Sequence, residues 1–192
     1  QSTIQGSEAL VEFDANTVWK RRLPKPYRNP DMDLRLRRHR TNVEARLTHE
    51  ARKIGVPTPL IKGIDPLNFT LEFQKVGDAD LSEGLNLQRV ENVVNYLSLL
   101  HSSGIVHGDP TTRNIRIDST SDKVYLIDFG LGFHTDNIED YAMDLHIFKE
   151  SLVGTSSNYE ELWNRATFVY ETQGSPHVLP RLQEIELRGR YL

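Results

Sequence analysis

One stretch of the sequence, residues 107–130 (HGDPTTRNIRIDSTSDKVYLIDFG), limits the possible folds more than any other. It places Asp109 and Asn114 five residues apart, and it ends with Asp128 followed by Phe-Gly. Residues 115–117 and 124–127 alternate as strands do, and the polar cluster between them indicates a turn. A hairpin of this length would bring Asn114 and Asp128 to neighbouring strand ends.

The side chains of this stretch suit a phosphotransfer site of the protein-kinase type. Transfer of the terminal phosphoryl group of ATP requires divalent metal and a group that orients the nucleophile. We expect Asp128 and Asn114 to be oxygen ligands of Mg²⁺, and Asp109 to orient the nucleophile or accept its proton. Asp-Phe-Gly alone is common, but the joint pattern His-x-Asp-x₄-Asn, hairpin, Asp-Phe-Gly is far more restrictive. His107 is expected to support the Asp-Phe-Gly segment structurally rather than to act as a base.

Composition excludes several classes of protein. The chain has 192 residues, and its 38% hydrophobic content is sufficient for one domain or two small lobes. It contains no Cys, which excludes disulfides, a thiolate nucleophile and Cys-bound zinc, and which makes a cytoplasmic location the expectation. No apolar run approaches the roughly twenty residues that span a bilayer, so no membrane association is expected.

Charge is unevenly distributed along the chain. The net charge is −4, yet residues 20–53 contain twelve Lys or Arg and only four Asp or Glu. This basic block is a candidate site for phosphate, either in ATP or in RNA. A solvated helix face explains most of these side chains at least as well.

The first third of the chain has the pattern of a kinase N-lobe. A turn at Gly6 and Ser7 stands where a kinase has a glycine-rich flap over the phosphates. A strand is expected at residues 17–20, and it ends on Lys20, in the place of the lysine that holds the α and β phosphates.

A helix is expected next, with Glu44 on it. Its apolar stripe comprises Leu36, Val43, Leu47, Ala51 and Ile54, and it ends before Gly55. Glu44 lies beside this stripe, so we expect it to pair with Lys20. Glu50 is the rival partner and is the less favoured of the two.

The remaining elements follow from the same periodicities. Strands are expected at residues 60–64 and 69–73. Residues 71–77, with Glu72 and Phe73 among them, stand in the place of the kinase hinge, whose backbone would bind adenine. The lobe boundary is expected near Gly77, which gives an N-lobe at residues 1–77 and a C-lobe at 78–192. Further helical stripes lie within residues 87–100, 138–152, 159–170 and 179–185.

The segments HGDPTTRN and LIDFGLGF resemble the HGDLTTSN and IDFGL signatures of the small atypical kinase/ATPase subunit of the KEOPS complex, the PRPK-type family. KRRLPKPYRNPDMD and RTNVEAR resemble the same family, in which an extended Pro-rich loop precedes the helix. Pro110 stands where that family has Leu, and Arg113 where it usually has Ser. Neither change removes a ligand, although Pro110 lacks an amide hydrogen and would stiffen the loop.

The resemblance implies an α+β, minimal two-lobed protein-kinase-like fold, with an antiparallel sheet and one helix in the N-lobe and a mainly helical C-lobe. It implies an ATP- and Mg²⁺-dependent serine/threonine kinase and ATPase that supports threonylcarbamoyladenosine modification of tRNA. The implied partners are the threonylcarbamoyl-transferase subunit, a Cgi121-like regulator at the N-lobe, and tRNA through basic segments such as Arg188-Gly189-Arg190.

Two further features agree with this family. Asp144 resembles the helix-borne Asp that braces the catalytic loop, and it follows Asp128 so closely that little room remains for a long activation segment. Water therefore becomes the more economical phosphoryl acceptor. Because the sequence begins with Gln, and because some archaeal relatives are fused behind the transferase subunit, we expect either a trimmed chain or a piece of a longer polypeptide.

Two other functions compete with this one. The fold would also serve as a nucleotide-gated, non-catalytic scaffold of the transferase subunit. A RIO-like protein kinase acting in ribosome maturation is the other alternative, because the RIO kinases are cousins of the PRPK-type family.

Overall fold

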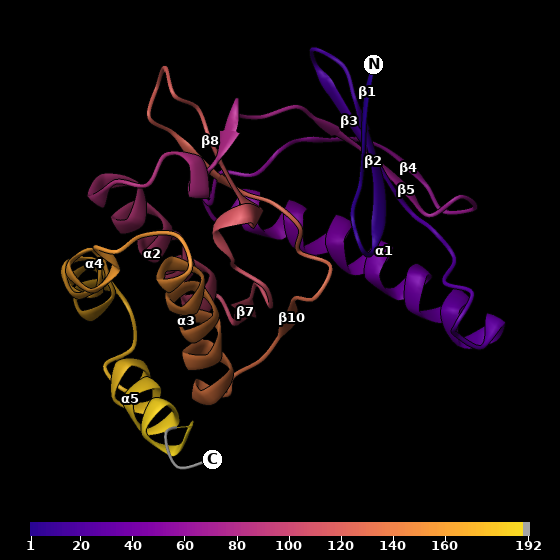
Figure 1. Ribbon diagram of the computed structural model, residues 1–192. Coiled ribbons are helices and arrows are strands. Elements are labelled where there is room, and N and C mark those ends of the chain that lie inside the picture. The colour runs from indigo at the N-terminus through magenta and orange to yellow at the C-terminus, as the bar shows by residue number, and fades with distance from the viewer. Residues whose placement is uncertain (190–192) are drawn as a thin grey trace.

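Strand-forming alternation in the first part of the chain produces an antiparallel sheet. The computed structural model describes residues 1–189, and its five-stranded sheet has the order β1-β2-β3-β5-β4. The strands are β1 (Ser2–Gln5), β2 (Ala9–Phe13), β3 (Thr17–Arg22), β4 (Ile61–Asp65) and β5 (Thr70–Gln74). One long helix, α1 (Pro30–Lys53), lies beside this sheet (Figure 1).

The helix α1 begins inside residues 20–33, the segment that was expected to form an extended Pro-rich loop before the helix. The helix begins at Pro30, and the Asn29 side chain accepts hydrogen bonds from the amides of Asp31 and Met32, at 3.0 and 3.3 Å. An N-cap Asn, a Pro at the first position and acidic residues in the first turn are the usual signals of a helix start. The Pro-rich loop therefore ends at Asn29.

The second lobe is mainly helical, as expected. It contains α2 (Leu87–Ser102), α3 (Ile138–Val153), α4 (Tyr159–Gln173) and α5 (Val178–Gly189). The expected hairpin is present, because β8 (Ile115–Ile117) and β9 (Val124–Leu126) pair antiparallel, with β6 (Ala79–Asp80) on the other side of β8. A further short pair joins β7 (Ile105–Val106) to β10 (Phe133–His134).

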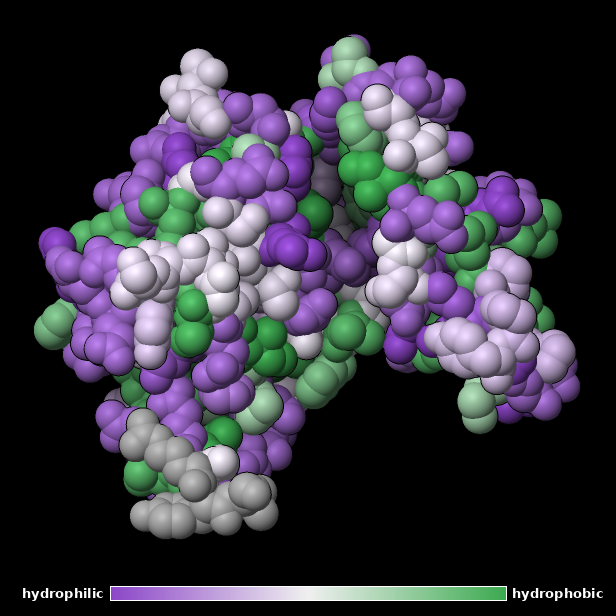
Figure 2. All heavy atoms as spheres, viewed as in Figure 1, coloured by the Kyte–Doolittle hydropathy of each residue, from purple (hydrophilic) through white to green (hydrophobic). Residues whose placement is uncertain are grey.

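The chain passes from one lobe to the other at Gly77. Gly77 has a φ of +70°, and a Cβ added there would lie 2.6 Å from the carbonyl oxygen of Ile117. The next amide, of Asp78, donates to that same oxygen at 2.9 Å. We therefore propose that the two lobes comprise residues 1–77 and 78–192. Figure 2 shows that the surface is hollowed between them.

One hydrophobic core joins α1 to the second lobe. Val43, Leu47 and Ala51 of α1 are buried in the same cluster as the inner faces of α2, α3 and α4 and the β8–β9 hairpin. The helix that carries Glu44 is thus packed against both lobes, and its position is fixed by apolar burial rather than by the sheet alone. Within residues 1–189, no helix is long and apolar enough to cross a membrane.

Candidate active site

Lys20 and Glu44 form the expected ion pair between the sheet and α1. Lys20 Nζ donates to Glu44 Oε2 at 3.0 Å, and the Glu44 side chain is 2% exposed. The rival carboxylate, Glu50, contacts Nε2 of His134 instead. A buried carboxylate needs such a cation, and in return it holds the ammonium group in one place.

Asp128 reaches the same ammonium from the other lobe. Its Oδ1 lies 2.8 Å from Lys20 Nζ, and the Asp128 side chain is 39% exposed. Burial alone would raise the pKa of Asp128, but Lys20 and then Arg22 outweigh it, so the pKa lies below the usual value. Asp128 has a φ of +61°, which is uncommon for a residue other than glycine.

Asn114 is held between Asp109 and the strand that leads to Asp128. Its Nδ2 donates to the carbonyl oxygen of Asp109 at 2.9 Å and to Oδ2 of Asp109 at 3.1 Å. The amide of Ile127 donates to the Asn114 carbonyl oxygen at 3.0 Å, which places Asn114 and Asp128 at neighbouring strand ends. With its nitrogen turned to Asp109, Asn114 has the side-chain oxygen left to act as a metal ligand.

The pKa of Asp109 is shifted in the opposite direction to that of Asp128. Burial raises the pKa of Asp109, and the nearby carboxylates of Asp128 and Asp144 raise it further, against the opposing effects of His107 and Asn114. A raised carboxyl pKa suits a group that accepts a proton near neutral pH. The pKa values of these two carboxyl groups are thus shifted in opposite directions within one site.

Asp144 of α3 braces the loop that carries Asp109. It is buried, and it accepts hydrogen bonds from the amides of His107, at 2.8 Å, and Gly108, at 2.9 Å. His101 Nε2 lies 2.9 Å from the same carboxylate. His107 in turn donates from Nε2 to the carbonyl oxygen of Ile127 at 2.8 Å, so it supports the Asp-Phe-Gly segment as expected.

Glu72 and Phe73 do not suit the hinge role assigned to them. Both lie inside β5, which pairs with β3 on one side and β4 on the other, so their backbone groups serve the sheet. Within the expected hinge, residues 71–77, only the part beyond β5 has backbone groups outside the sheet ladder. We propose that adenine binds along residues 75–77, where the chain leaves β5 and crosses between the lobes.

Gly6 and Ser7 lie in the turn between β1 and β2, as expected. The Gly6 amide donates to the carbonyl oxygen of Ala9 at 2.9 Å, within the turn itself. Ser7 contributes its carbonyl oxygen to Lys25 Nζ. Their contact with phosphate stays a prediction.

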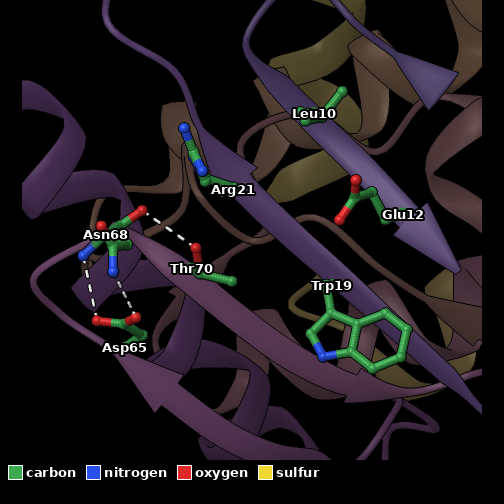
Figure 3. A pocket seen from close by; sticks show the side chains of 7 residues that line it. All are labelled: Leu10, Glu12, Trp19, Arg21, Asp65, Asn68 and Thr70. Atoms are coloured by element: carbon green, nitrogen blue, oxygen red, sulfur yellow. Dashed lines mark hydrogen bonds between the residues drawn. The ribbon is translucent and has the colours of Figure 1, made fainter. Parts of the chain in front are cut away.

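Sequence reasoning missed Arg22, which lies two residues after Lys20 and is 4% exposed. Alternation along β3 directs Lys20 and Arg22 to the same face, and no motif marks the second of them. Trp19 and Arg21 alternate to the opposite face, where they line a surface pocket (Figure 3). That pocket is lined by Leu10, Glu12, Trp19, Arg21, Asp65, Asn68 and Thr70, none of which belongs to the cluster around Lys20.

Hard oxygen donors in this cluster are few. Across residues 1–189, no group of three or more His, Cys, Asp or Glu residues is placed to hold a metal ion. Asp128 and Asn114 thus offer two protein ligands. Mg²⁺ sites in phosphotransfer proteins usually have one or two protein carboxylates and are completed by phosphate and water.

Comparison with known proteins agrees with this geometry. The model of the phosphotransferase enzyme family (APH) matches residues 39–171. A probable serine/threonine-protein kinase BUD32 homolog of Archaeoglobus fulgidus is 35% identical over 188 residues, which are 97% of this chain and 94% of that protein. The chain belongs to the Bud32/PRPK-type kinase family. The resemblance found in the sequence is thus confirmed.

Longer members of the Bud32/PRPK-type family are more similar still. A probable bifunctional tRNA threonylcarbamoyladenosine biosynthesis protein of Haloarcula marismortui is 50% identical, covering 98% of this chain and 35% of that protein. Its counterpart in Haloquadratum walsbyi is 49% identical, covering 100% of this chain and 36% of that protein. The chain therefore spans about a third of the length of these curated relatives.

A solved structure confirms the kinase-like fold of this Bud32/PRPK-type chain. The Rio2 kinase ADP/Mg²⁺-phosphoaspartate complex from Chaetomium thermophilum superimposes with a TM-score of 0.65, covering 100% of this chain and 71% of that chain. Its sequence identity is 14%, so the likeness concerns the fold alone. The sequence identity to the Bud32-type protein, 35%, is higher than that to the Rio2 kinase, 14%, and this difference favours the Bud32/PRPK-type family over the RIO kinases.

Proposed function

We propose that this chain is an ATP-dependent atypical serine/threonine kinase and ATPase that supports threonylcarbamoyladenosine modification of tRNA. The observation that carries the proposal is the meeting of Lys20, held by Glu44 at 3.0 Å, with Asp128 at 2.8 Å. The Archaeoglobus relative, named as a probable kinase, supports the reaction class. The Haloarcula and Haloquadratum relatives, named for threonylcarbamoyladenosine biosynthesis, support the tRNA pathway.

The residues present fit ATP and Mg²⁺. The lowered pKa of Asp128 keeps its carboxylate ionised, and the Asn114 amide oxygen is a second hard ligand at the neighbouring strand end. These two residues would hold the metal, and Lys20 would bind phosphate oxygens. Bound Mg²⁺ neutralises charge on the phosphates, which is the largest electrostatic requirement of phosphoryl transfer.

Asp109 and its neighbours would act on the nucleophile. The carboxylate accepts the proton of the incoming hydroxyl or water, and Asn114 Nδ2 fixes its orientation through a 3.1 Å hydrogen bond. Residues 131–137 alone separate Gly130 from α3, which leaves little surface for docking a peptide. We therefore propose that hydrolysis of ATP is the main reaction and that serine phosphorylation is secondary.

The partners and the location belong to the proposal as well. We propose that the chain acts in the cytoplasm with a threonylcarbamoyl-transferase subunit, a Cgi121-like regulator at the N-lobe, and tRNA. The names of the bifunctional relatives support the link to threonylcarbamoyl transfer. In the expected basic tail, Arg188 contacts Glu139 at 3.1 Å, and Arg190 lies outside the described residues.

Turnover of ATP by Asp128→Ala tests the proposed function. We expect the wild type to release phosphate from ATP in a Mg²⁺-dependent manner. The variant should lose this activity, because it lacks the carboxylate that contacts Lys20 and would hold the metal. Asp122→Ala is the matched control, since Asp122 also has a positive φ, of 62°, and lies in the hairpin turn away from Lys20. The control should retain turnover.

Other outcomes would count against the proposal. Equal rates for the wild type and Asp128→Ala would contradict it, as would a wild type that neither binds nucleotide nor releases phosphate. Binding of ADP without any turnover, also in the presence of the transferase and tRNA, would favour the scaffold function instead.

A further inference from the structure

Arg22 carries a buried positive charge, and it has no role in the reaction proposed above. The side chain is 4% exposed, although a guanidinium in the interior is costly unless other charges surround it. Its backbone belongs to β3, where Arg22 pairs with the buried Ala9 of β2. A buried Arg at this place therefore needs an explanation beyond strand formation.

The guanidinium contacts the second oxygen of the carboxylate that holds Lys20. Arg22 Nη2 lies 2.8 Å from Glu44 Oε1, while Lys20 Nζ lies 3.0 Å from Glu44 Oε2. Glu44 is thus shared by two cations, one on each oxygen. Neither Arg22 Nη1 nor Glu44 Oε1 forms an aligned hydrogen bond with another described residue, so one buried donor and one buried acceptor remain incompletely satisfied.

Arg22 also extends toward the second lobe. Its Nη2 lies 3.9 Å from Asp128 Oδ1, the atom that Lys20 contacts at 2.8 Å. The four side chains make a cluster in which two cations balance two carboxylates. Without Arg22, Lys20 would be the single cation between Glu44 and Asp128, and the place where phosphate oxygens would bind would carry excess negative charge.

Gly130 lies directly against this guanidinium. A Cβ added at Gly130 would lie 2.4 Å from Arg22 Nη2, whereas the next nearest atoms are 3.5 Å away. The φ of Gly130 is not in the positive range that favours glycine, so its backbone would accept alanine. A side chain at this position would therefore meet the Arg22 guanidinium before any other group, and one of the two would have to move.

We propose that Arg22 is a positioning residue for the nucleotide phosphates. It holds Glu44, and through Glu44 the Lys20 ammonium, and it offsets the negative charge of Asp128 across the lobe junction. This inference rests on the proposed function of the same site, and it adds a second cation behind the phosphate-binding Lys20.

The first test compares two adjacent arginines. Arg22→Met should weaken binding of ADP without metal, measured by calorimetry, and raise the KM for ATP by about 10- to 100-fold, the usual effect of losing a charged hydrogen-bonding group. The kcat should change less, because the contact serves binding. Arg21→Met is the matched control, since Arg21 is exposed on the opposite face of β3 (Figure 3), and it should behave as the wild type.

Arg22→Lys separates charge from geometry. Lysine keeps the positive charge but lacks the planar fork, so it should restore ADP binding only in part. An Arg22→Lys protein that binds ADP no better than Arg22→Met would overturn the charge-offset role. An Arg22→Met protein that binds ADP as tightly as Arg21→Met would overturn the proposal.

A double-mutant cycle tests the contact with Gly130. Gly130→Ala should weaken ADP binding in the wild type, because it displaces the guanidinium, and should have little further effect in the Arg22→Met background. The same four proteins, unfolded in urea without nucleotide, should show the same non-additivity in the free energy of unfolding. Additive losses in both measurements would overturn the proposal.

Failure of this inference is distinguishable from failure of the proposed function. In one case the wild type binds ADP and turns over ATP while Arg22→Met and Arg21→Met bind ADP equally well. That result would contradict the role of Arg22 and leave the proposed function intact. A wild type without nucleotide binding or turnover removes both roles.

Discussion

At the scale of single residues, the site separates two carboxyl groups by their surroundings. Asp128 faces Lys20 and has a lowered pKa, whereas Asp109 is partly buried next to other carboxylates and has a raised pKa. The first is suited to remain a charged ligand and the second to exchange a proton. The two pKa shifts are caused by neighbouring residues of both lobes, so they exist only in the folded protein.

The raised pKa of Asp109 predicts a particular pH dependence. Because Asp109 must be ionised to accept a proton, kcat should fall as the pH drops through a value above 3.8, the ordinary value for Asp. Asp109→Asn should abolish turnover while ADP binding is retained. A pH profile of kcat, with ADP binding measured by calorimetry, checks both statements. A turnover rate that persists in Asp109→Asn would contradict the role of the base.

The raised pKa of Asp109 also affects the stability of the fold. The sign of this effect is opposite to that of a carboxyl group whose pKa is lowered. A carboxyl whose folded pKa is raised destabilises the fold at neutral pH, and the effect disappears as the pH falls through the folded pKa. Asp109→Asn should therefore unfold at the same or a slightly higher urea concentration than the wild type at pH 7. A clear loss of stability would indicate a structural role instead.

Motif spacing and strand alternation predicted part of the site. Lys20, Glu44 and Asp128 were predicted because strand ends and a helical stripe place them, and the structure brings these three side chains together. Arg22 was missed because buried arginine has no local signal, and its partners come from three distant segments. Glu72 and Phe73 were included in the expected hinge because apolar alternation does not indicate which strand edges are already paired.

At the scale of elements, α3 holds the catalytic loop through one side chain. Asp144 accepts hydrogen bonds from two successive loop amides and lies 2.9 Å from His101 Nε2, and all of these groups are buried or half-buried. The burial of Asp144 would raise its pKa, but the contacts with His101 and with His107 outweigh it and lower the pKa. The brace thus connects α2, α3 and the loop before β8.

Loss of this brace should be costly. Asp144→Ala leaves the amides of His107 and Gly108 and the His101 ring without their acceptor, so the free energy of unfolding should fall by about 3–5 kcal/mol. Glu150→Ala, on the exposed face of the same helix, is the control and should change little. Urea unfolding of both variants decides between them. Equal stabilities would mean that the brace contributes nothing.

The pH dependence of stability provides a second measure of the same brace. The folded pKa of Asp144 lies below 3.8, so its contribution is present above that value and is lost as the pH falls through the folded pKa. The wild type should therefore lose stability in acid more steeply than Asp144→Ala. Parallel acid-unfolding curves would contradict this assignment.

At the scale of the whole molecule, the two lobes are joined by a shared core and by one narrow crossing. The buried face of α1 packs into the core of the second lobe, which explains how a helix of the N-lobe can hold Glu44 near Asp128. Helix periodicity predicted Val43, Leu47 and Ala51 of this face, whereas Leu36 of the expected stripe is half-buried and lies outside the shared core. Which lobe it would pack against was not predictable, because an amphipathic stripe indicates burial but not its partner.

The crossing at Gly77 yields a prediction for the molecule as a unit. Gly77→Ala forces a side chain into a φ of +70°, which costs about 1–2 kcal/mol, and brings a Cβ to 2.6 Å from the Ile117 carbonyl oxygen. Gly55→Ala, with a φ of +95° and no atom within 4 Å, has the conformational cost without the collision. Both variants should lose stability in urea. Gly77→Ala alone should also lose ATP turnover, because residue 77 must move away from Ile117 of β8 and so shift the first lobe relative to the second. If the two variants turn over ATP equally, the crossing does not set the distance between Lys20 and Asp128.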